Sequence, residues 1–150
     1  MINQLHKLKI FIAGHKGMVG ASLYNYFTKN NITKIITATR KQLDLQSPGN
    51  VDKFIRKNKP DVIINCAGKV GGILANSTYP TEFLYENIYI QTNLIKSAYK
   101  NKVKHFIFPS CTVMYQSSDV PVKESDFDES VDLYPKYYGG GNTKVYIEKL

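Results

Sequence analysis

Three glycines near the amino terminus have the clearest chemical use in the sequence. They stand in the run Gly14-His15-Lys16-Gly17-Met18-Val19-Gly20, directly after the apolar stretch from Leu8 to Ala13. Glycine there permits a tight turn and a close approach of the backbone to an anion, and a following helix would present free amides and its positive dipole end. The spacing is GxxGxxG instead of the more common GxGxxG, and a turn with only a structural role is the alternative. The strand-turn-helix context predicts a dinucleotide site with contacts from Gly14, Gly17, Met18, Val19 and Gly20.

The end of the second apolar run indicates which dinucleotide would bind. An NAD site places Asp or Glu there to bind the ribose hydroxyls, whereas a 2′-phosphate requires cations. This chain has Arg40, which can bind a phosphate through two hydrogen bonds, and Lys41, which adds a point charge. Two solvated loop cations are the alternative, but the pair favours NADP. Asp44 and Leu45 are candidates to contact the amino group and the face of the adenine.

Strand and helix patterns alternate along the chain. Apolar runs at 8–13, 34–39, 61–66 and 103–108 predict strands. Between them, helical spacing is present at Met18, Val19, Leu23 and Phe27, at Val51, Phe54 and Ile55, and at Phe83, Ile90, Leu94 and Ala98. Because parallel strands need crossover connections, this order predicts an α/β fold with a doubly wound, Rossmann-like parallel sheet and helices on both faces. Residues 116–138 are predicted to form a long loop.

Composition and charge exclude several classes of protein. The chain has 150 residues, 43% of them hydrophobic and 21% charged, which is typical of one globular domain and not of a disordered or fibrous chain. The net charge of +8 is dispersed, so nucleic-acid binding is not expected. No apolar run is long enough to span a membrane, and no signal peptide is evident, which favours a cytoplasmic location. Cys66 and Cys111 are far apart and outside any ligand pattern, so no metal site is expected.

Four further motifs carry a family resemblance. They are Cys66-Ala67-Gly68-Lys69-Val70-Gly71-Gly72-Ile73 with Ala75-Asn76, Tyr79-Pro80-Thr81-Glu82-Phe83, Glu86-Asn87 and Gln91-Thr92-Asn93. Together with the glycine run they resemble the GDP-L-fucose synthase family, NADPH-dependent epimerase/reductases among the extended short-chain dehydrogenases/reductases. The resemblance implies cofactor contacts from Ala67, Gly68 and Lys69. It covers only the amino-terminal half of the family's fold, so residues 1–150 are expected to be an NADP-binding fragment without the substrate domain.

The resemblance also implies a catalytic set, which the sequence matches in part. Ser110 stands at the family's serine position and would orient the sugar ketone, and Lys144 matches the lysine that binds the nicotinamide ribose and acidifies a tyrosine. The family's tyrosine position, four residues before Lys144, holds Gly140. Tyr138 is the nearest substitute and Tyr137 a weaker one. The family's epimerising cysteine position falls on Thr112, beside Cys111, so reduction is better supported than epimerisation.

The region around this tyrosine also carries an expectation about structure. Because three consecutive glycines, Gly139 to Gly141, disfavour a helix and Asn142 is a good N-cap, the helix bearing Lys144 is predicted to start at Asn142. Tyr138 would then reach the site from an irregular segment.

The preferred function is therefore NADPH-dependent reduction, with or without epimerisation, of a GDP-linked 4-keto-6-deoxy sugar. The alternatives are an inactive nucleotide-binding remnant and another sugar-nucleotide epimerase or dehydratase of the same superfamily. This chain alone is predicted to have no turnover, because the substrate-binding half is missing. A homodimer is expected through the helix at 83–101, which carries Tyr85, Tyr89 and Tyr99.

Overall fold

The structure is a computed structural model that describes residues 5–128, 130 and 132–150. Its internal contacts divide the chain into two compact units. Unit 1 contains the chain up to Gly68 together with Tyr89–Pro109, and unit 2 contains Lys69–Ile88 and Ser110–Leu150. Within the described residues, none of the helices is both long and apolar enough to cross a lipid bilayer.

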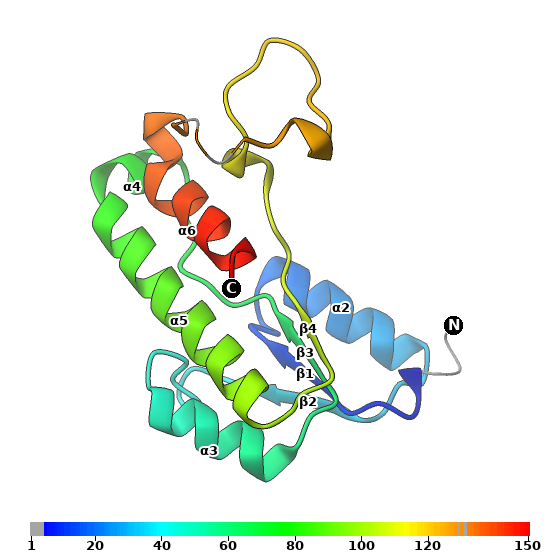
Figure 1. The fold of residues 1–150 in the computed structure, drawn as a ribbon. Helices are drawn as coiled ribbons and strands as arrows, with labels where there is room; N and C mark the ends of the chain where they lie inside the picture. Colours follow the sequence, from blue (N-terminus) through cyan, green and yellow to red (C-terminus); the bar gives the residue numbers. More distant parts are fainter. Residues whose placement is uncertain (1–4, 129, 131) are drawn as a thin grey trace. The chain divides into compact units, whose positions relative to one another are not determined.

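Unit 1 contains a four-stranded parallel sheet in the order β2-β1-β3-β4 (Figure 1). The strands are β1 (Ile10–Ala13), β2 (Ile35–Ala38), β3 (Val62–Asn65) and β4 (His105–Ile107). Ile10 pairs with both Ile35 and Val62, and Val62 pairs with His105, so all four strands start level. Their carboxyl ends therefore share one edge of the sheet, and the predicted parallel α/β sheet is confirmed.

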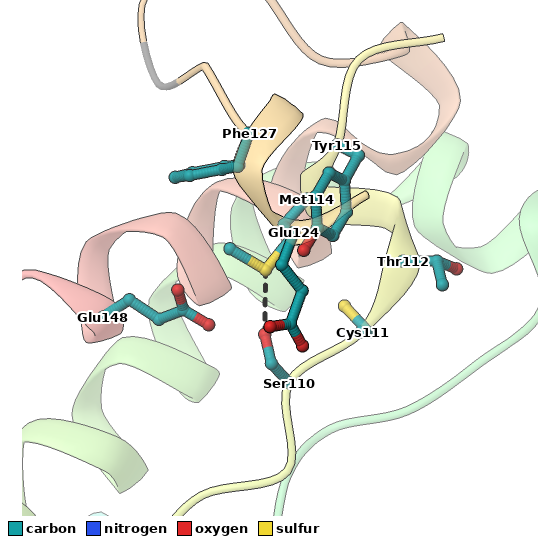
Figure 2. Close-up of a pocket in the computed structure, with 8 residues that line it drawn as sticks. All are labelled: Ser110, Cys111, Thr112, Met114, Tyr115, Glu124, Phe127 and Glu148. Carbon is teal, nitrogen blue, oxygen red and sulfur yellow. Dashed lines mark hydrogen bonds between the residues drawn. The ribbon is translucent and has the colours of Figure 1, made fainter. Parts of the chain in front are cut away.

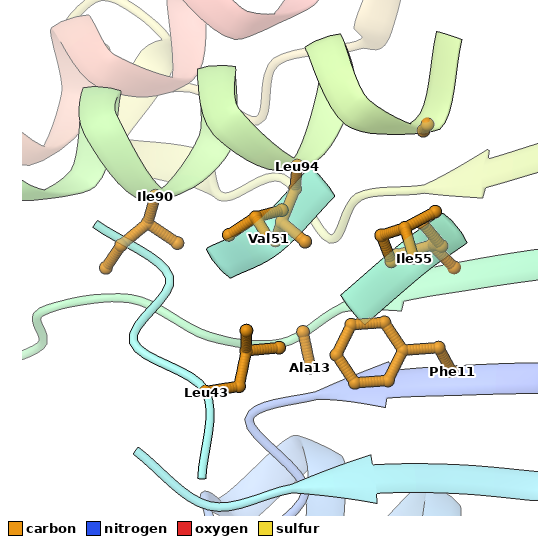
Figure 3. Close-up of a cluster of buried hydrophobic side chains, with 9 residues drawn as sticks. Phe11, Ala13, Leu43, Val51, Ile55, Ile90 and Leu94 are labelled. Atoms are coloured by element: carbon orange, nitrogen blue, oxygen red, sulfur yellow. The ribbon is translucent and has the colours of Figure 1, made fainter. Parts of the chain in front are cut away.

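Helices cover both faces of this sheet (Figure 1). On one face, α3 (Pro48–Asn58) and α5 (Pro80–Lys100) contribute Val51, Ile55 and Leu94 to a buried cluster that includes Phe11 of β1 (Figure 3). On the other face, Phe27 of α2 (Met18–Lys29) packs with alternate residues of β1 and β3. Burial of both faces explains why the strands read as continuous apolar runs in the sequence.

Two predicted members of the α2 stripe are not buried. The side chain of Met18 is 89% exposed and that of Val19 is 46% exposed, whereas Phe27 is buried and Leu23 half-buried. The apolar spacing correctly predicts the helix, but the first turn of α2 lies outside the apolar core. The α5 stripe is confirmed in full, since Phe83, Ile90, Leu94 and Ala98 are all buried.

Unit 2 contains α4 (Ile73–Thr78), the first turns of α5, three 3-10 helices and α6 (Tyr138–Glu148). The 3-10 helices are η1 (Thr112–Met114), η2 (Glu124–Asp126) and η3 (Pro135–Tyr137). The predicted loop at 116–138 therefore contains two short helical turns. The sequence pattern missed α4, because none of its residues is buried and no apolar stripe marks it.

The predicted start of α6 at Asn142 is wrong. The helix begins at Tyr138 and runs through all three glycines, and Asn142 Nδ2 donates to Tyr138 O at 2.8 Å from within it. A Cβ at Gly139 would overlap the Pro80 carbonyl oxygen, and one at Gly141 would lie 2.7 Å from Val113 O. Close backbone packing in unit 2 therefore requires glycine in this helix and offsets its poor helix propensity.

Candidate functional site

The predicted glycine turn lies at the carboxyl edge of the sheet, between β1 and α2. Gly14 has φ of +82°, a left-handed conformation that favours glycine. A Cβ there would lie 2.7 Å from Ala67 N, and a Cβ at Gly20 would overlap Gly14 O. The turn therefore packs backbone against backbone on both sides, and both of these positions require glycine.

The amino end of α2 is open to an anion. Gly17 is its N-cap and makes no side-chain capping bond, and the first turn has no acidic residue. The amides of the first turn and the helix dipole therefore favour a negatively charged group at this position. Met18 and Val19, which begin the helix, are exposed beside it.

The predicted cations follow β2, the neighbour of β1 in the sheet. Arg40 and Lys41 are both exposed in a turn in which the Gln42 side chain accepts from Thr39 N–H at 2.9 Å. Asp44 is exposed and accepts from Gln46 N–H, whereas Leu45 is half-buried against the core. The structure thus places this segment on the β2 side of the glycine turn.

The turn after β3 lies on the other side of β1. Cys66 N–H donates to Ala13 O at 2.9 Å, and Ala67 contacts Gly14 as described above. The chain leaves β1 through α2 to reach β2 on one side, and later crosses to β3 on the other side. Such a change of direction is where open α/β sheets bind ligands at the carboxyl ends of their strands.

These features of unit 1 fit a dinucleotide. The open helix terminus and the glycine backbone match a pyrophosphate, and Arg40 and Lys41 match a further phosphate on the β2 side. The structure places the predicted residues after the carboxyl ends of three neighbouring strands, β1, β2 and β3, and their contacts with a cofactor stay a prediction. The residues concerned are Gly14, Gly17, Met18, Val19, Gly20, Arg40, Lys41, Asp44, Leu45, Ala67 and Gly68.

Lys69 belongs to unit 2, where its backbone and side chain are both held. Its N–H donates to Asn87 Oδ1 at 2.7 Å, and Asn87 Nδ2 donates back to Lys69 O at 3.0 Å. Its ammonium pairs with Glu86 at 2.5 Å and lies 5.6 Å from the centre of the Phe83 ring. The motif Glu86-Asn87 thus fixes the start of the Lys-Val-Gly-Gly segment.

Ser110 lines a cavity of about 490 Å³ in unit 2 (Figure 2). Its hydroxyl donates to the sulfur of Met114 at 2.9 Å, and Cys111, a free thiol, lies beside it. Glu124 and Glu148 place carboxylates around the same cavity, and Tyr115 and Phe127 add aromatic rings. A cavity of this size and mixed polarity suits a small polar ligand such as a sugar.

Tyr138 and Lys144 lie on one continuous helix. Lys144 comes six positions after Tyr138, which corresponds to about 120° around the helix axis and about 9 Å along it. Gly140, four residues before Lys144, lies on the same helix face as the lysine. Tyr138 is about half exposed and Lys144 is half-buried. The expected route for Tyr138 from an irregular segment is therefore wrong, because the residue opens the helix.

Four side-chain amides lie beside predicted site residues, although the sequence predicted no role for them. Asn65 and Gln91 form a buried pair next to Ala67, Asn93 binds the Leu45 backbone, and Asn87 binds Lys69. The sequence did carry a signal for each of them, since Asn65 ends an apolar strand and the motifs of the family resemblance contain Asn87, Gln91 and Asn93.

Comparisons with known proteins point to the same kind of fold. GDP-L-fucose synthase 1 of Arabidopsis thaliana is 40% identical over 118 residues, which is 78% of this chain and 36% of that protein. The GDP-L-fucose synthase of Escherichia coli is 34% identical over 123 residues, or 81% and 38% of the two chains. A GDP-mannoheptose C4 reductase from Campylobacter jejuni, solved with NADP bound, has a TM-score of 0.88 and 33% identity over 95% of this chain and 45% of that one.

The matches cover most of this chain but only part of each relative. The chain spans slightly more than a third of the length of these two synthases. A sequence model described as the NAD dependent epimerase/dehydratase family matches residues 10–149, which include the glycine turn, the ends of β2 and β3, and α6. By this match and by its parallel sheet, the chain belongs to the NAD dependent epimerase/dehydratase family.

Proposed function

We propose that residues 1–150 form the NADP-binding domain of a reductase that acts on GDP-linked 4-keto sugars. The observation that carries the proposal is the arrangement around β1, where a glycine turn and an open helix terminus are flanked by Arg40 and Lys41. The similar Campylobacter reductase was solved with NADP bound, which supports the same cofactor here. When bound, NADPH would supply a hydride to the substrate.

The substrate class follows from the relatives. Those at 34–41% identity include synthases of GDP-L-fucose and of GDP-L-colitose, and the similar solved structure is a GDP-mannoheptose C4 reductase. All of these names describe GDP-linked sugars. Reduction at C4 is therefore the proposed reaction, and epimerisation is a weaker part of the proposal, because Thr112 stands at the position where the family's cysteine is expected.

Three residues of unit 2 are proposed to act on the substrate. Ser110 would donate a hydrogen bond to the ketone oxygen from its place in the cavity. Lys144 would bind the nicotinamide ribose, and a phenol would supply the proton. Tyr138 is the proposed phenol. Its offset of six residues makes it the weakest of the three assignments, and Gly140 occupies the helix position that would face Lys144 directly.

The test is the oxidation of NADPH in the presence of GDP-4-keto-6-deoxymannose, measured as the loss of NADPH absorbance in a protein that joins this chain to a substrate-binding domain of the family, since the chain alone is expected to show no turnover. Turnover that falls by about a hundredfold in Ser110→Ala and in Lys144→Met would support the proposed roles, at the scale usual for a general acid–base or positioning group. Turnover unchanged in Ser110→Ala would contradict them. Cofactor binding without turnover in that joined protein would favour the second candidate, a nucleotide-binding domain without activity, to which Gly140 points.

The tyrosine assignment has its own test. Tyr138→Phe removes only the hydroxyl and should abolish turnover if Tyr138 donates the proton. Gly140→Tyr places a phenol one helical turn from Lys144. It should not raise turnover if Tyr138 already donates the proton. A gain of activity in Gly140→Tyr, with no loss in Tyr138→Phe, would reassign the proton donor.

Two finer features complete the proposal. The protein is proposed to form a homodimer through α5, whose Tyr85, Tyr89 and Tyr99 are exposed. Sedimentation would test this, with Tyr99→Glu expected to shift the mass to that of a monomer.

A cytoplasmic location is also proposed, in agreement with the two free cysteines, and cell fractionation would check it.

A further inference from the structure

Gln91 belongs to a buried polar chain that ends at the predicted cofactor site. Asn65, the last residue of β3, is 2% exposed, and its Nδ2 donates to Oε1 of Gln91, which is 3% exposed on α5. Asn65 Oδ1 accepts from Ala67 N–H at 3.0 Å. Two buried amides in an apolar core are costly unless they are paired, so this arrangement specifies where the chain turns after β3.

The turn that Asn65 holds is the one that contacts the glycine turn. The space at the Gly14 Cα is so narrow that a Cβ would lie 2.7 Å from Ala67 N and Cys66 C. A shift of Ala67 would therefore open or close the space beside Gly14. Gln91 is thus connected to the pyrophosphate-binding backbone through Asn65 and Ala67 without reaching it directly.

Asn93 makes an equivalent contact on the β2 side. Its Nδ2 donates to Leu45 O at 3.0 Å, although the two residues are 48 positions apart. Leu45 is the residue predicted to pack on the adenine, and it is half-buried against the core. Two side chains of α5, separated by one residue, therefore hold the strand-end segments on either side of β1.

We propose that Gln91 and Asn93 are positioning residues for the two halves of the dinucleotide, Gln91 for the nicotinamide half beyond β3 and Asn93 for the adenosine half beyond β2. The inference rests on the proposed NADP site. In the sheet order β2-β1-β3, a dinucleotide whose pyrophosphate lies at the glycine turn extends its two nucleosides toward β2 and β3. Each α5 side chain then acts chiefly on one half, through backbone that it holds by hydrogen bonds.

The experiment measures the Kd of two ligands for this chain by titration calorimetry. NADPH contains both halves, whereas 2′,5′-ADP contains the adenosine half without the nicotinamide. Gln91→Met keeps the side-chain volume but leaves the buried Asn65 Nδ2 unpaired. It should raise the Kd of NADPH on the order of tenfold and should raise that of 2′,5′-ADP, whose 5′-phosphate also meets the Gly14 turn, by clearly less. Asn93→Leu should raise the Kd of both ligands by the same factor, about tenfold.

Two further variants separate positioning from general stability. Gln91→Glu keeps an acceptor for Asn65 Nδ2 and should restore NADPH binding relative to Gln91→Met. Asn101→Leu is the matched control, because Asn101 directly follows α5 and binds Asp52 of α3 at 3.0 Å, at the opposite edge of the sheet. It should lower the melting temperature and leave both Kd values unchanged.

The outcomes are distinct. If wild-type chain binds no NADPH, the proposed function fails and this inference fails with it. The inference alone is overturned if wild type binds but both α5 variants keep their Kd within about twofold, if Gln91→Met weakens both ligands equally, or if Asn101→Leu weakens them as much as the α5 variants do. Asn93 is only partly buried, so Asn93→Leu still decides the question if Gln91→Met does not fold.

Discussion

The two glycine clusters of this chain, at 14–20 and at 139–141, look alike in sequence but have different roles in the structure. In the first, Gly14 adopts a conformation that favours glycine in the turn between β1 and α2, and Gly20 lies in the first turn of α2. In the second, Gly139 to Gly141 have ordinary helical geometry and lie inside α6. What the clusters share is close contact between backbones, at Ala67 in one and at Pro80 and Val113 in the other. Glycine can therefore mark a turn, as at Gly14, or a tight packing site inside a helix, as at Gly20 and Gly139.

The largest effect is expected from substitution in the first cluster. A Cβ at Gly20 would overlap Gly14 O, and one at Gly14 would add a strained φ to contacts of 2.7 Å. Gly20→Ala should destabilise the fold by about 1–3 kcal/mol through overpacking and abolish measurable NADPH binding, because the turn must open. Thermal unfolding and calorimetry check both effects. Normal cofactor binding in Gly20→Ala would contradict the assigned turn.

Substitutions in the second cluster should differ in sign between neighbours. Gly139→Ala would overlap the Pro80 carbonyl and should cost about 1–3 kcal/mol of unfolding free energy. Gly140→Ala approaches only the Asn76 side-chain oxygen, at 3.3 Å, and should stabilise α6 by about 0.5–1 kcal/mol through helix propensity. Denaturant unfolding of the matched pair measures both values. Equal effects at the two positions would show that packing against Pro80 is not the reason for glycine.

The smallest effect is expected at the amino edge of the sheet, opposite the glycine turn. There Lys104 donates to Asp61 at 2.8 Å and Lys9 N–H donates at 2.9 Å, and these bonds hold the pKa of the Asp61 carboxyl below its ordinary value. A carboxyl with a lowered pKa in the folded state stabilises the fold above about pH 4, and this contribution is lost as the pH falls through the folded pKa. Asp61→Asn should therefore flatten the loss of stability below about pH 4 and leave NADPH binding unchanged.

Unfolding of wild type and Asp61→Asn at a series of pH values between about 2 and 6 would measure this difference. Parallel curves for the two proteins would contradict the assigned role of Asp61. A change in cofactor affinity at neutral pH would show that the two edges of the sheet are not independent.

Much of unit 1 could be predicted because its local and tertiary signals agree. Phe11, Ile63 and Leu94 are apolar where the strand and helix patterns require it, and all are buried in one cluster. The glycine turn follows β1 in the chain, so proximity in sequence placed its residues correctly. The hydrogen bond between Asn65 and Gln91 could not be predicted, because the two residues are 26 positions apart and neither local sequence indicates the partner.

In unit 2 the local signals disagree with the contacts. Glycine propensity argued against a helix at 139–141, and only the approach of Pro80 and Val113, far away in the sequence, reverses that preference. The family resemblance predicted Ser110, but its bond to Met114 and the cavity around it depend on η1 and on the segment containing Glu124. Such contacts are set by tertiary packing and have no periodic signature.

The most direct test of the central claim is a calorimetric comparison of NADPH with NADH. With Arg40 and Lys41 beyond β2 where an NAD site would have a carboxylate, NADPH should bind at least about tenfold more tightly, or about 1.4 kcal/mol. Arg40→Ala should remove most of this preference and leave NADH affinity unchanged. Equal affinities of the wild-type chain for the two cofactors, or no binding of either, would contradict the assignment of an NADP site.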